Sequence, residues 1–353
     1  MSETNQALTI GGVTVQPGER KVIDLPVAKL YTHIEAAIPL QVVCGKLPGP
    51  RLFVSAAIHG DELNGVEIAR RLLKSGALKR LRGTLIVAPI VNVFGLIQHS
   101  RYLPDRRDLN RSFPGSQGGS LAARLAHIFL DEVVKGCDYG IDLHTGAIHR
   151  SNLPQIRANL DDPETRQLAE AFSVPVLLNA NLRDGSLRQA AAEHGVKILL
   201  YEAGEALRFD ELSIRGGVRG ILSVMRCLSM LPPTKKSIKK LEPFIARSSG
   251  WERATESGLL RSSTPLGARV SKGDVLGVIS DPTDFLNVDE SEIRAHHSGL
   301  VIGKSNIPLV NEGDALFHIA RFEDIQDAAA SVEAFQSVAD RVPNPMFDDQ
   351  TLV

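Results

Sequence analysis

The sequence predicts an α/β protein with a mixed, mostly parallel sheet flanked by helices, followed by a small C-terminal all-β domain. Between about residues 30 and 205, short apolar runs alternate with segments of helical spacing, as in sheets whose strands are joined by crossover helices. After residue 244 the chain changes to short β-like runs with frequent glycine, and this part contains an internal repeat.

The first domain is predicted to span residues 1–231 and to contain alternating strands and helices. Strands are predicted where short apolar runs end at turn residues, at 51–58, 83–92, 138–146, 174–180 and 197–204. Helices are predicted where apolar residues recur every three or four positions, at 62–76, 120–136, 163–172, 186–195 and 209–231.

The remaining chain divides into a linker, a β domain and a tail. Residues 232–244 are basic and proline-flanked with little apolar content, so they are predicted to be a linker. Within 245–322, VSKGDVLGVI (270–279) recurs as VNEGDALFHI (310–319), and each Gly-Asp pair indicates a tight turn. This domain resembles the barrel-sandwich hybrid of biotinyl and lipoyl carriers, without the lysine that carriers modify. Residues 323–353 form a C-terminal tail.

The composition argues against several classes of function. The 353 residues are 43% hydrophobic and 23% charged, as in ordinary globular proteins. A formal net charge of -1 gives no sign of binding to nucleic acid or to an anionic membrane. Three scattered cysteines predict neither a disulfide framework nor a thiolate zinc site. A polar start and the lack of a long apolar stretch predict a cytoplasmic location, and the apolar β surface is compatible with a homo-oligomer.

The stretch AAIHGDELNG (56–65) interrupts an apolar run at a predicted junction of strand and helix. His59 ends the strand, and Glu62 in the first helical turn shares its face because the two are three residues apart. Ligands of open α/β sheets bind at the carboxyl ends of strands, so this pair is placed to bind a metal ion. Alternatively, Asp61 and Glu62 offset the helix dipole and His59 is a core histidine.

A second predicted strand ends in IDLHTG, which contains His144 and, two residues earlier, Asp142. His59, Glu62 and His144 together form the ligand set that is typical of a catalytic zinc with an open fourth position. Water in that position becomes a nucleophile at neutral pH. The sequence therefore predicts one Zn²⁺ per chain, and Asp142 either orients a ligand histidine or bonds only to backbone.

Two further segments carry candidate functional residues. The arginine-rich loop HSRYLPDRRDLNRSFPG (99–115) is either a solvated surface loop or a carboxylate-binding element with Asn110 and Arg111 beside the zinc. In the second case Arg101 would polarise the scissile carbonyl. Glu202, at the end of the predicted strand 197–204, either caps that strand in solvent or accepts the proton of the zinc-bound water.

Read in order, these motifs are His59-x-x-Glu62, Asn110-Arg111, His144 and Glu202. Their order and spacing resemble the succinylglutamate desuccinylase/aspartoacylase family, a branch of the zinc-carboxypeptidase fold. The resemblance covers residues from about 45 to 230, and the β region at 245–322 also resembles the C-terminal half of this family. It implies a zinc-carboxypeptidase-like fold for the first domain.

The resemblance also implies a role for each residue. Zinc would be bound by His59, Glu62 and His144, with Glu202 as general base and then general acid. Asn110 and Arg111 would bind a substrate carboxylate, and Arg101 would stabilise the oxyanion. Arg188 is either a second substrate-binding arginine or part of a solvated helix face. The implied reaction is hydrolysis of a small N-acyl amino acid, or a related amide, to a carboxylate and an amine.

Three functions are therefore compatible with these residues. The leading one is a zinc-dependent amidohydrolase acting on a small-molecule N-acyl amino acid. The alternatives are a zinc carboxypeptidase or amidase acting on peptides, and a non-catalytic binding module. The β region favours small substrates, because the resemblance implies that it narrows the cleft. The presence of all three ligands and of Glu202, and the missing carrier lysine, disfavour the binding module.

Overall fold

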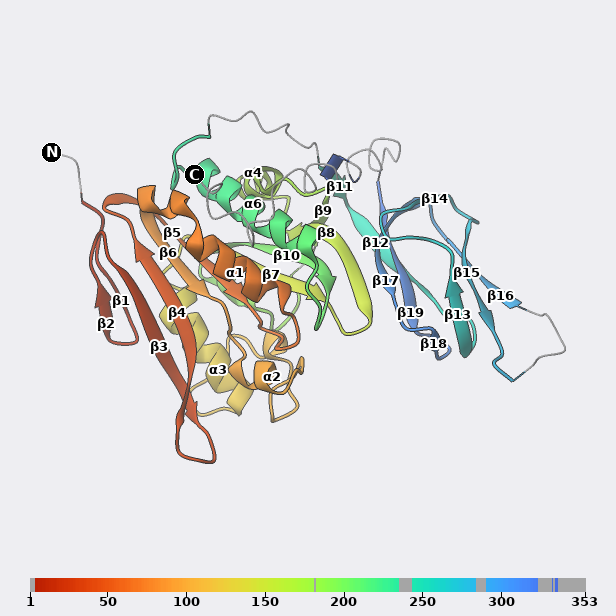
Figure 1. Cartoon of the computed structure of the whole chain (residues 1–353), viewed down its shortest axis with the longest axis horizontal. Coiled ribbons are helices and arrows are strands. Elements are labelled where there is room, and N and C mark those ends of the chain that lie inside the picture. The colour runs from red at the N-terminus through yellow and green to blue at the C-terminus, as the bar shows by residue number, and fades with distance from the viewer. Residues whose placement is uncertain are drawn as a thin grey trace.

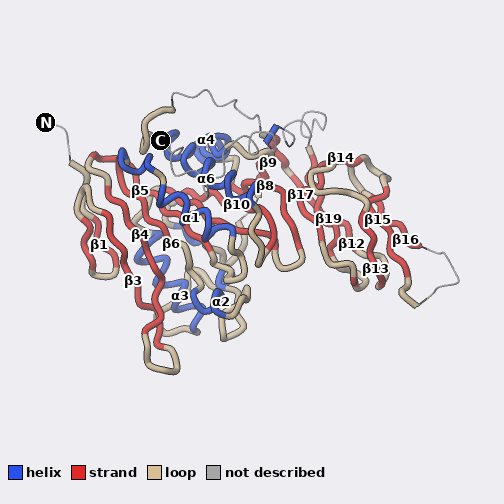
Figure 2. Tube along the Cα trace, viewed as in Figure 1, coloured by secondary structure: helices blue, strands red, loops and turns tan. Residues whose placement is uncertain are grey.

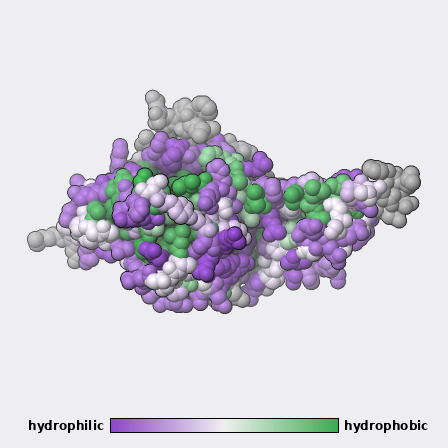
Figure 3. Space-filling view, turned by 90° about the horizontal axis from the view of Figure 1, so that it is seen from below, coloured by the Kyte–Doolittle hydropathy of each residue, from purple (hydrophilic) through white to green (hydrophobic). Residues whose placement is uncertain are grey.

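The computed structural model describes residues 4–180, 182–234, 243–283 and 290–322, together with 332, 334 and 335. These residues form a large lobe, in which helices cover a sheet, and a narrower arm of strands that extends from one side (Figures 1 and 2). No described helix is long and apolar enough to cross a membrane. Hydrophilic side chains cover much of the face seen in Figure 3, and apolar residues occur there in smaller patches.

The large lobe contains most of the helices and the first strands. Its strands are β1 (Leu8–Ile10), β2 (Val13–Val15), β3 (Arg20–Lys29), β4 (Glu35–Cys44), β5 (Leu47–Ala56), β6 (Arg82–Ala88), β7 (Tyr139–Gly146), β8 (Arg150–Ala158), β9 (Val176–Asn179), β10 (Lys197–Glu205) and β11 (Phe244–Ala246). Its helices are α1 (Asn64–Lys74), α2 (Val93–Ile97), α3 (Leu121–Phe129), α4 (Pro163–Phe172), α5 (Leu187–Glu193) and α6 (Glu211–Cys227).

The predicted helices and strands of the first domain are confirmed. The five predicted strands correspond to β5, β6, β7, β9 and β10, and the five predicted helices to α1, α3, α4, α5 and α6. Polar caps begin several of these helices: Asp162 accepts from the backbone N–H of Thr165 at α4, and Asp210 accepts from that of Ser213 at α6. The α3 helix continues in a π turn, Leu130–Val134, which accounts for the longer predicted segment.

The large sheet is mixed, as predicted, and parallel pairs outnumber antiparallel ones among its described strands in the large lobe, five to three. Its strand order is β12-β19-β17-β8-β10-β7-β5-β6-β4-β3, with β9, β11 and β14 pairing off this path. The parallel pairs are β5-β6, β5-β7, β7-β10, β8-β9 and β9-β11, and all its other described pairs are antiparallel. The antiparallel pairs come mainly from the long hairpin of β3 and β4, from β8 and from the C-terminal strands. Among the missed strands, β8 carries Asn152, Pro154 and Gln155, which weaken its apolar pattern.

Two apolar cores cover the two faces of the sheet in the large lobe. One contains Ile68 of α1, Phe172 of α4 and Ile221 of α6. The other contains Phe129 of α3 and Ala190 of α5. The helices therefore flank the parallel strands on both sides, and they leave the carboxyl ends of β5, β7 and β10 at one edge (Figure 1). Side chains at these strand ends can converge there.

The C-terminal strands lie in two sheets around a separate apolar core. They are β12 (Ser248–Arg253), β13 (Gly258–Ser262), β14 (Arg269–Val270), β15 (Val275–Ser280), β16 (Glu290–Arg294), β17 (Gly299–Ser305), β18 (Leu309–Val310) and β19 (Ala315–Arg321). The internal repeat is confirmed: Asp274 accepts from the Ser271 N–H at 2.7 Å, and Asp314 accepts from the Asn311 N–H at 2.8 Å. Each repeat therefore forms the same turn.

The C-terminal strands continue the sheet of the large lobe. β17 pairs antiparallel with β8, so one sheet runs without interruption from β3 to β12. Most of the predicted linker, 235–242, lies outside the described residues, and at its end β11 pairs with β9. The predicted tail also lies mostly outside them. Its described Phe335 is buried at 1% exposure, with the Arg219 guanidinium 5.0 Å from the centre of its ring.

Candidate metal centre and active site

His59, Glu62 and His144 come from the ends of two neighbouring parallel strands. His59 lies three residues beyond β5, and His144 lies near the carboxyl end of β7, which pairs with β5. A tight turn brings Glu62 beside His59, because the Glu62 backbone N–H donates to the His59 carbonyl oxygen. The expectation that Glu62 lies in the first helical turn is wrong: α1 begins at Asn64, and Glu62 belongs to the turn before it.

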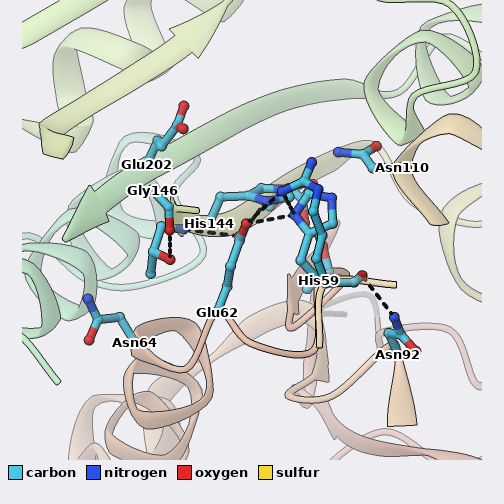
Figure 4. A network of polar contacts seen from close by, with 12 residues as sticks. His59, Glu62, Asn64, Asn92, Asn110, His144, Gly146 and Glu202 are labelled. Carbon is cyan, nitrogen blue, oxygen red and sulfur yellow. Dashed lines mark hydrogen bonds and ion pairs between the residues drawn. The ribbon is translucent and has the colours of Figure 1, made fainter. Parts of the chain in front are cut away.

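The Glu62 carboxylate lies between the two imidazoles (Figure 4). Its Oε1 is 2.7 Å from His59 Nδ1, and its Oε2 is 2.8 Å from His144 Nδ1. Ligand atoms of the three residues all lie within 4.8 Å of one another, and the three side chains are buried. This group can therefore hold a metal ion, because a compact set of two imidazoles and one carboxylate matches the ligands of catalytic zinc.

The protonation of this group follows from its burial and charges. Burial alone would raise the pKa of Glu62, but His59 and His144 outweigh it and hold that pKa well below its usual value. Burial opposes protonation of His144, yet Asp142 and Glu62 raise its pKa well above the usual value. A histidine must be neutral to bind a metal ion, so metal binding by this group would release any proton that the two histidines carry.

A carboxylate contacts the Nε2 atom of each histidine ring. His144 Nε2 lies 2.8 Å from Asp142 Oδ2, and Asp142 Oδ1 accepts from the Ser55 hydroxyl at 2.7 Å. Asp142 therefore contacts a ligand histidine, one of the two alternatives that the sequence left open. His59 Nε2 lies 3.0 Å from Asp108 Oδ1. Because Nε2 of each ring is paired with a carboxylate, Nδ1 is the atom available for a metal.

Arg101 reaches the metal group from the arginine-rich loop. Its Nη1 is 3.2 Å from His59 Nδ1 and 3.4 Å from Glu62 Oε1. Asp108 holds the same guanidinium, at 2.9 Å from Nη2 and 3.2 Å from Nε. Asp108 thus contacts both Arg101 and His59. Asp108 was not among the predicted site residues, although it stands two positions before Asn110 in the DLNR stretch.

Asn110 and Arg111 lie in a short 3-10 turn, Leu109–Arg111, and both line the same cavity. The Asn110 side-chain oxygen accepts from the Leu187 backbone N–H at the start of α5, at 2.9 Å. The Arg111 guanidinium donates to the carbonyl oxygen of Asn110. Asn110 therefore ties the loop to α5, and Arg111 lines the cavity from that anchored turn.

Glu202 lies in β10, the strand next to β7. It is the register partner of His144, and its carboxylate contacts Asn152 Nδ2 at 2.7 Å and Arg157 Nε at 2.6 Å. Arg188 lines the cavity from α5. Burial, together with the charges of Arg157 and Arg183, lowers the pKa of Arg188 to about 10.

These residues line one cavity of about 760 Å³. Its wall includes residues of the C-terminal strands, namely Ser248, Ser249, Trp251 and His318. Its arginines are Arg101, Arg111, Arg150, Arg157, Arg183 and Arg188, whereas its carboxylates are Glu62, Asp142 and Glu202. Arginines therefore outnumber carboxylates, and the cavity is suited to an anionic molecule.

The C-terminal side of the cavity is built from stacked rings. The Trp251 and His318 rings are parallel within 8° with centroids 4.7 Å apart, and the Arg150 guanidinium lies 5.3 Å from the centre of the Trp251 ring. The sequence contained no signal for these residues or for Asn152, Arg157 and Arg183. Arg183 lies in the loop between β9 and α5, and the other residues reach the cavity through pairing between strands that are distant in sequence.

Comparison with known proteins agrees with this geometry. The family profile of the succinylglutamate desuccinylase/aspartoacylase catalytic domain matches residues 48–228. The N-alpha-acetyl-L-2,4-diaminobutyric acid deacetylase of Halomonas elongata is 27% identical over 293 residues, which cover 80% of this chain and 85% of that protein.

Solved structures show the same fold. A succinylglutamate desuccinylase/aspartoacylase from Rhodobacter sphaeroides has a TM-score of 0.75 at 25% identity, covering 86% of this chain and 96% of that one. The product-bound ectoine utilization protein EutE (DoeB) from Ruegeria pomeroyi has a TM-score of 0.76 at 24% identity, covering 85% and 95%. Because the family profile matches residues 48–228, which is 181 of the 353 residues, the chain belongs to the succinylglutamate desuccinylase/aspartoacylase family.

Proposed function

We propose that this protein is a zinc-dependent hydrolase that cleaves the amide bond of a small N-acyl amino acid. The observation that carries the proposal is the compact group of His59, Glu62 and His144, at a cavity that Glu202 also lines. Such a ligand set belongs to catalytic zinc sites with an open position. When bound, zinc supplies a Lewis acid and lowers the pKa of a water.

Each side chain around this group has a separate role in the proposed reaction. Glu202 accepts the proton of the attacking water and returns it to the leaving nitrogen, so that a carboxylate and an amine are released. Arg101, whose Nη1 lies 3.2 Å from His59 Nδ1, stabilises the negative charge that develops on the carbonyl oxygen. Asn110 and Arg111 bind the carboxylate of the amino acid, since arginine pairs with carboxylates through parallel hydrogen bonds.

We further propose that residues 245–322 restrict the site to small substrates. Ser249, Trp251 and His318 close one side of the cavity, which leaves less room for a long peptide than an open cleft would. This arrangement disfavours the alternative of a carboxypeptidase that acts on long peptides. It also disfavours a purely binding module, because Glu202 and the metal group face the same enclosed volume.

The charge of the cavity limits which N-acyl amino acids are suitable substrates. The Halomonas relative is named for an N-acetyl amino acid with a second amino group, so N-acetyl amino acids are the first compounds to test. Six arginines against three carboxylates favour a neutral or acidic side chain over a cationic one here. Arg188 is the candidate for binding an additional carboxylate of the acyl group or side chain.

The test combines metal analysis with a panel of substrates. We expect about one zinc per chain in protein purified without added metal, lost in His144→Ala, and release of free amine from N-acetyl or N-succinyl amino acids. His296→Ala is the matched control, because this histidine is 81% exposed between β16 and β17 and does not line the cavity. Protein that binds no zinc even after supplementation, or that hydrolyses no amide when loaded with zinc, would contradict the proposal.

A further inference from the structure

We propose that Asn152 and Arg157, from β8, are positioning residues that fix the orientation of the Glu202 carboxylate, and that Gly303 of β17 keeps the space that Asn152 needs. The inference rests on the proposed role of Glu202 as general base. In this arrangement β8, which the sequence pattern did not identify as a strand, orients the general base. Gly303 links the C-terminal strands to the same carboxylate through Asn152.

Both oxygens of the Glu202 carboxylate are held by β8. Asn152 Nδ2 donates to Oε1 at 2.7 Å, and the Arg157 guanidinium lies 2.6 Å from Oε2 through Nε. The side chains of Arg157 and Glu202 are each 17% exposed. A carboxylate with a hydrogen bond at one oxygen and an ion pair at the other cannot rotate freely, so its orientation in the cavity is set before substrate enters.

A β-bulge makes this double contact feasible. Asn152 and Arg157 are five residues apart, so in a regular strand their side chains would point to opposite faces of the sheet. The register of β8 against β10 shifts between the pairs Glu202↔Gln155 and Gly204↔Asn152. Between these two pairs β8 advances by three residues while β10 advances by two, so β8 contains one additional residue. This residue changes which face of the sheet the following side chains point to, and Asn152 and Arg157 therefore lie on the same face. Pro154 lies inside this bulge, where proline is tolerated because the ladder is interrupted.

Gly303 of β17 extends the arrangement to the C-terminal strands. It is the register partner of Asn152, and a Cβ placed on it would lie 2.7 Å from Asn152 Oδ1. The next contact, with the His318 Cβ, is 3.2 Å. Since Oδ1 is the end of a side chain, Gly303→Ala would displace the Asn152 amide rather than the backbone. Gly303 itself is not part of the cavity wall, but His318 is, so this variant is interpreted together with the substitutions at Asn152.

The competing explanation is that Arg157 binds substrate itself, because it also lines the cavity. A substrate-binding arginine would change KM, and its effect would not depend on Glu202. A positioning residue would change kcat, and its effect would vanish once Glu202 can no longer act. The two explanations are therefore separable by a double-mutant cycle.

The experiment measures zinc content, kcat and KM for Asn152→Ala, Asn152→Asp, Arg157→Met, Arg157→Lys and Gly303→Ala, each with Glu202 intact and in the Glu202→Gln background. With Glu202 intact we expect kcat to fall about 10- to 100-fold for Asn152→Ala, Asn152→Asp, Arg157→Met and Gly303→Ala, the loss typical of a misplaced reacting group. KM and zinc content should stay within about twofold. Arg157→Lys should recover part of the kcat, because it retains the charge but not the geometry.

In the Glu202→Gln background the same substitutions should cause no further loss. Gly250→Ala is the matched control for Gly303→Ala, because its Cβ meets only the Arg321 side chain at 3.1 Å in β12 of the same sheet. Ser151→Ala is the control on β8, since its hydroxyl contacts Asn306 and Glu205 rather than Glu202. Both controls should leave kcat unchanged.

Three results would overturn the inference while leaving the proposed function intact: an unchanged kcat in the β8 variants, a change confined to KM, or an equal loss of kcat in both backgrounds. A Glu202→Gln protein that keeps full activity would instead contradict the general-base role itself. The failure of the inference is thus distinguished from the failure of the function on which it rests.

Discussion

Glu202 and His144 are register partners on the adjacent parallel strands β10 and β7. Parallel neighbours in register place their side chains on the same face of a sheet, so this pairing brings the proposed general base beside a proposed metal ligand. The relationship explains how two residues that are 58 positions apart in the sequence, 144 and 202, serve one site. It also makes the site depend on the register of the sheet.

Asp108 and Asp142, which contact His59 and His144, should control the affinity of the proposed metal site. We expect Asp142→Asn to weaken zinc binding about 10- to 100-fold, because the amide no longer orients His144 or increases its basicity. Competition with a chromophoric chelator measures this affinity. Asp138→Asn is the matched control, since Asp138 lies outside the cavity and accepts from the Arg51 backbone N–H. An affinity for zinc equal to that of the wild type would show that Asp142 does not tune the site.

Arg101 and Arg111 should affect different kinetic parameters. Arg101→Met is expected to lower kcat about 100-fold or more, since its guanidinium would stabilise charge that appears only in the transition state. Arg111→Met should instead mainly raise KM, because it would bind the carboxylate equally in the ground state and the transition state. Steady-state kinetics at saturating zinc provides both values. The assignment of roles is wrong if Arg101→Met changes KM alone or if Arg111→Met leaves both values unchanged.

The excess of arginine in the cavity should appear as a preference for anionic substrates. Among N-acetyl amino acids of similar size, kcat/KM should be higher for acidic side chains than for side chains with an ammonium group. Raising the salt concentration should reduce this difference, because it screens charges near the cavity mouth. Arg188→Gln should also reduce it. A clear preference for the cationic substrate would refute this interpretation of the cavity charge.

An ion-pair network between α1 and α6, in which Glu67 and Arg71 are buried, should make stability depend on pH. Glu67 contacts Arg70 and Arg71 at 2.6 Å each, and Arg71 reaches Glu211 of α6 at 2.7 Å. The hydrogen bond from Arg70 lowers the pKa of Glu67, burial opposes this effect, and Arg71 adds to it. Because the folded pKa is lower than the unfolded one, stability from Glu67 is present above about pH 4 and is lost as the pH falls through the folded pKa.

We therefore expect Glu67→Gln to lower the free energy of unfolding by about 1 to 3 kcal/mol at pH 7, the range for hydrogen bonds to charged groups. The difference between wild type and variant should shrink as the pH falls below about 4, near the pKa of a glutamate in an unfolded chain. Urea unfolding at about pH 7 and about pH 3.5, by the same probe, tests both statements. Glu170→Gln is the control, because its pair with Arg166 is exposed and should contribute little. A pH-independent difference would exclude the linkage.

The sequence by itself determined five strands and five helices of the first domain and pointed to the candidate residues that stand at their ends. His59 and Glu62 could be identified because a strand, a turn and a helix follow one another within ten residues, and each leaves a short-range pattern. Asn110, Arg111, His144 and Glu202 were identified for the same reason, since each stands in a loop or at a strand end. The repeat of the C-terminal strands was visible because duplicated turns need the same Gly-Asp pair.

Only the tertiary structure decided what surrounds those residues. The hairpin of β3 and β4 and the strand β8 make the sheet mixed, because strand direction depends on pairing and not on apolar pattern. Asn152 and Arg157 reach Glu202 through a shift in register, and Trp251 and His318 reach the cavity through pairing of β17 with β8. Such long-range contacts follow from how strands align across the whole sheet, and local sequence carries no periodic signal for that alignment.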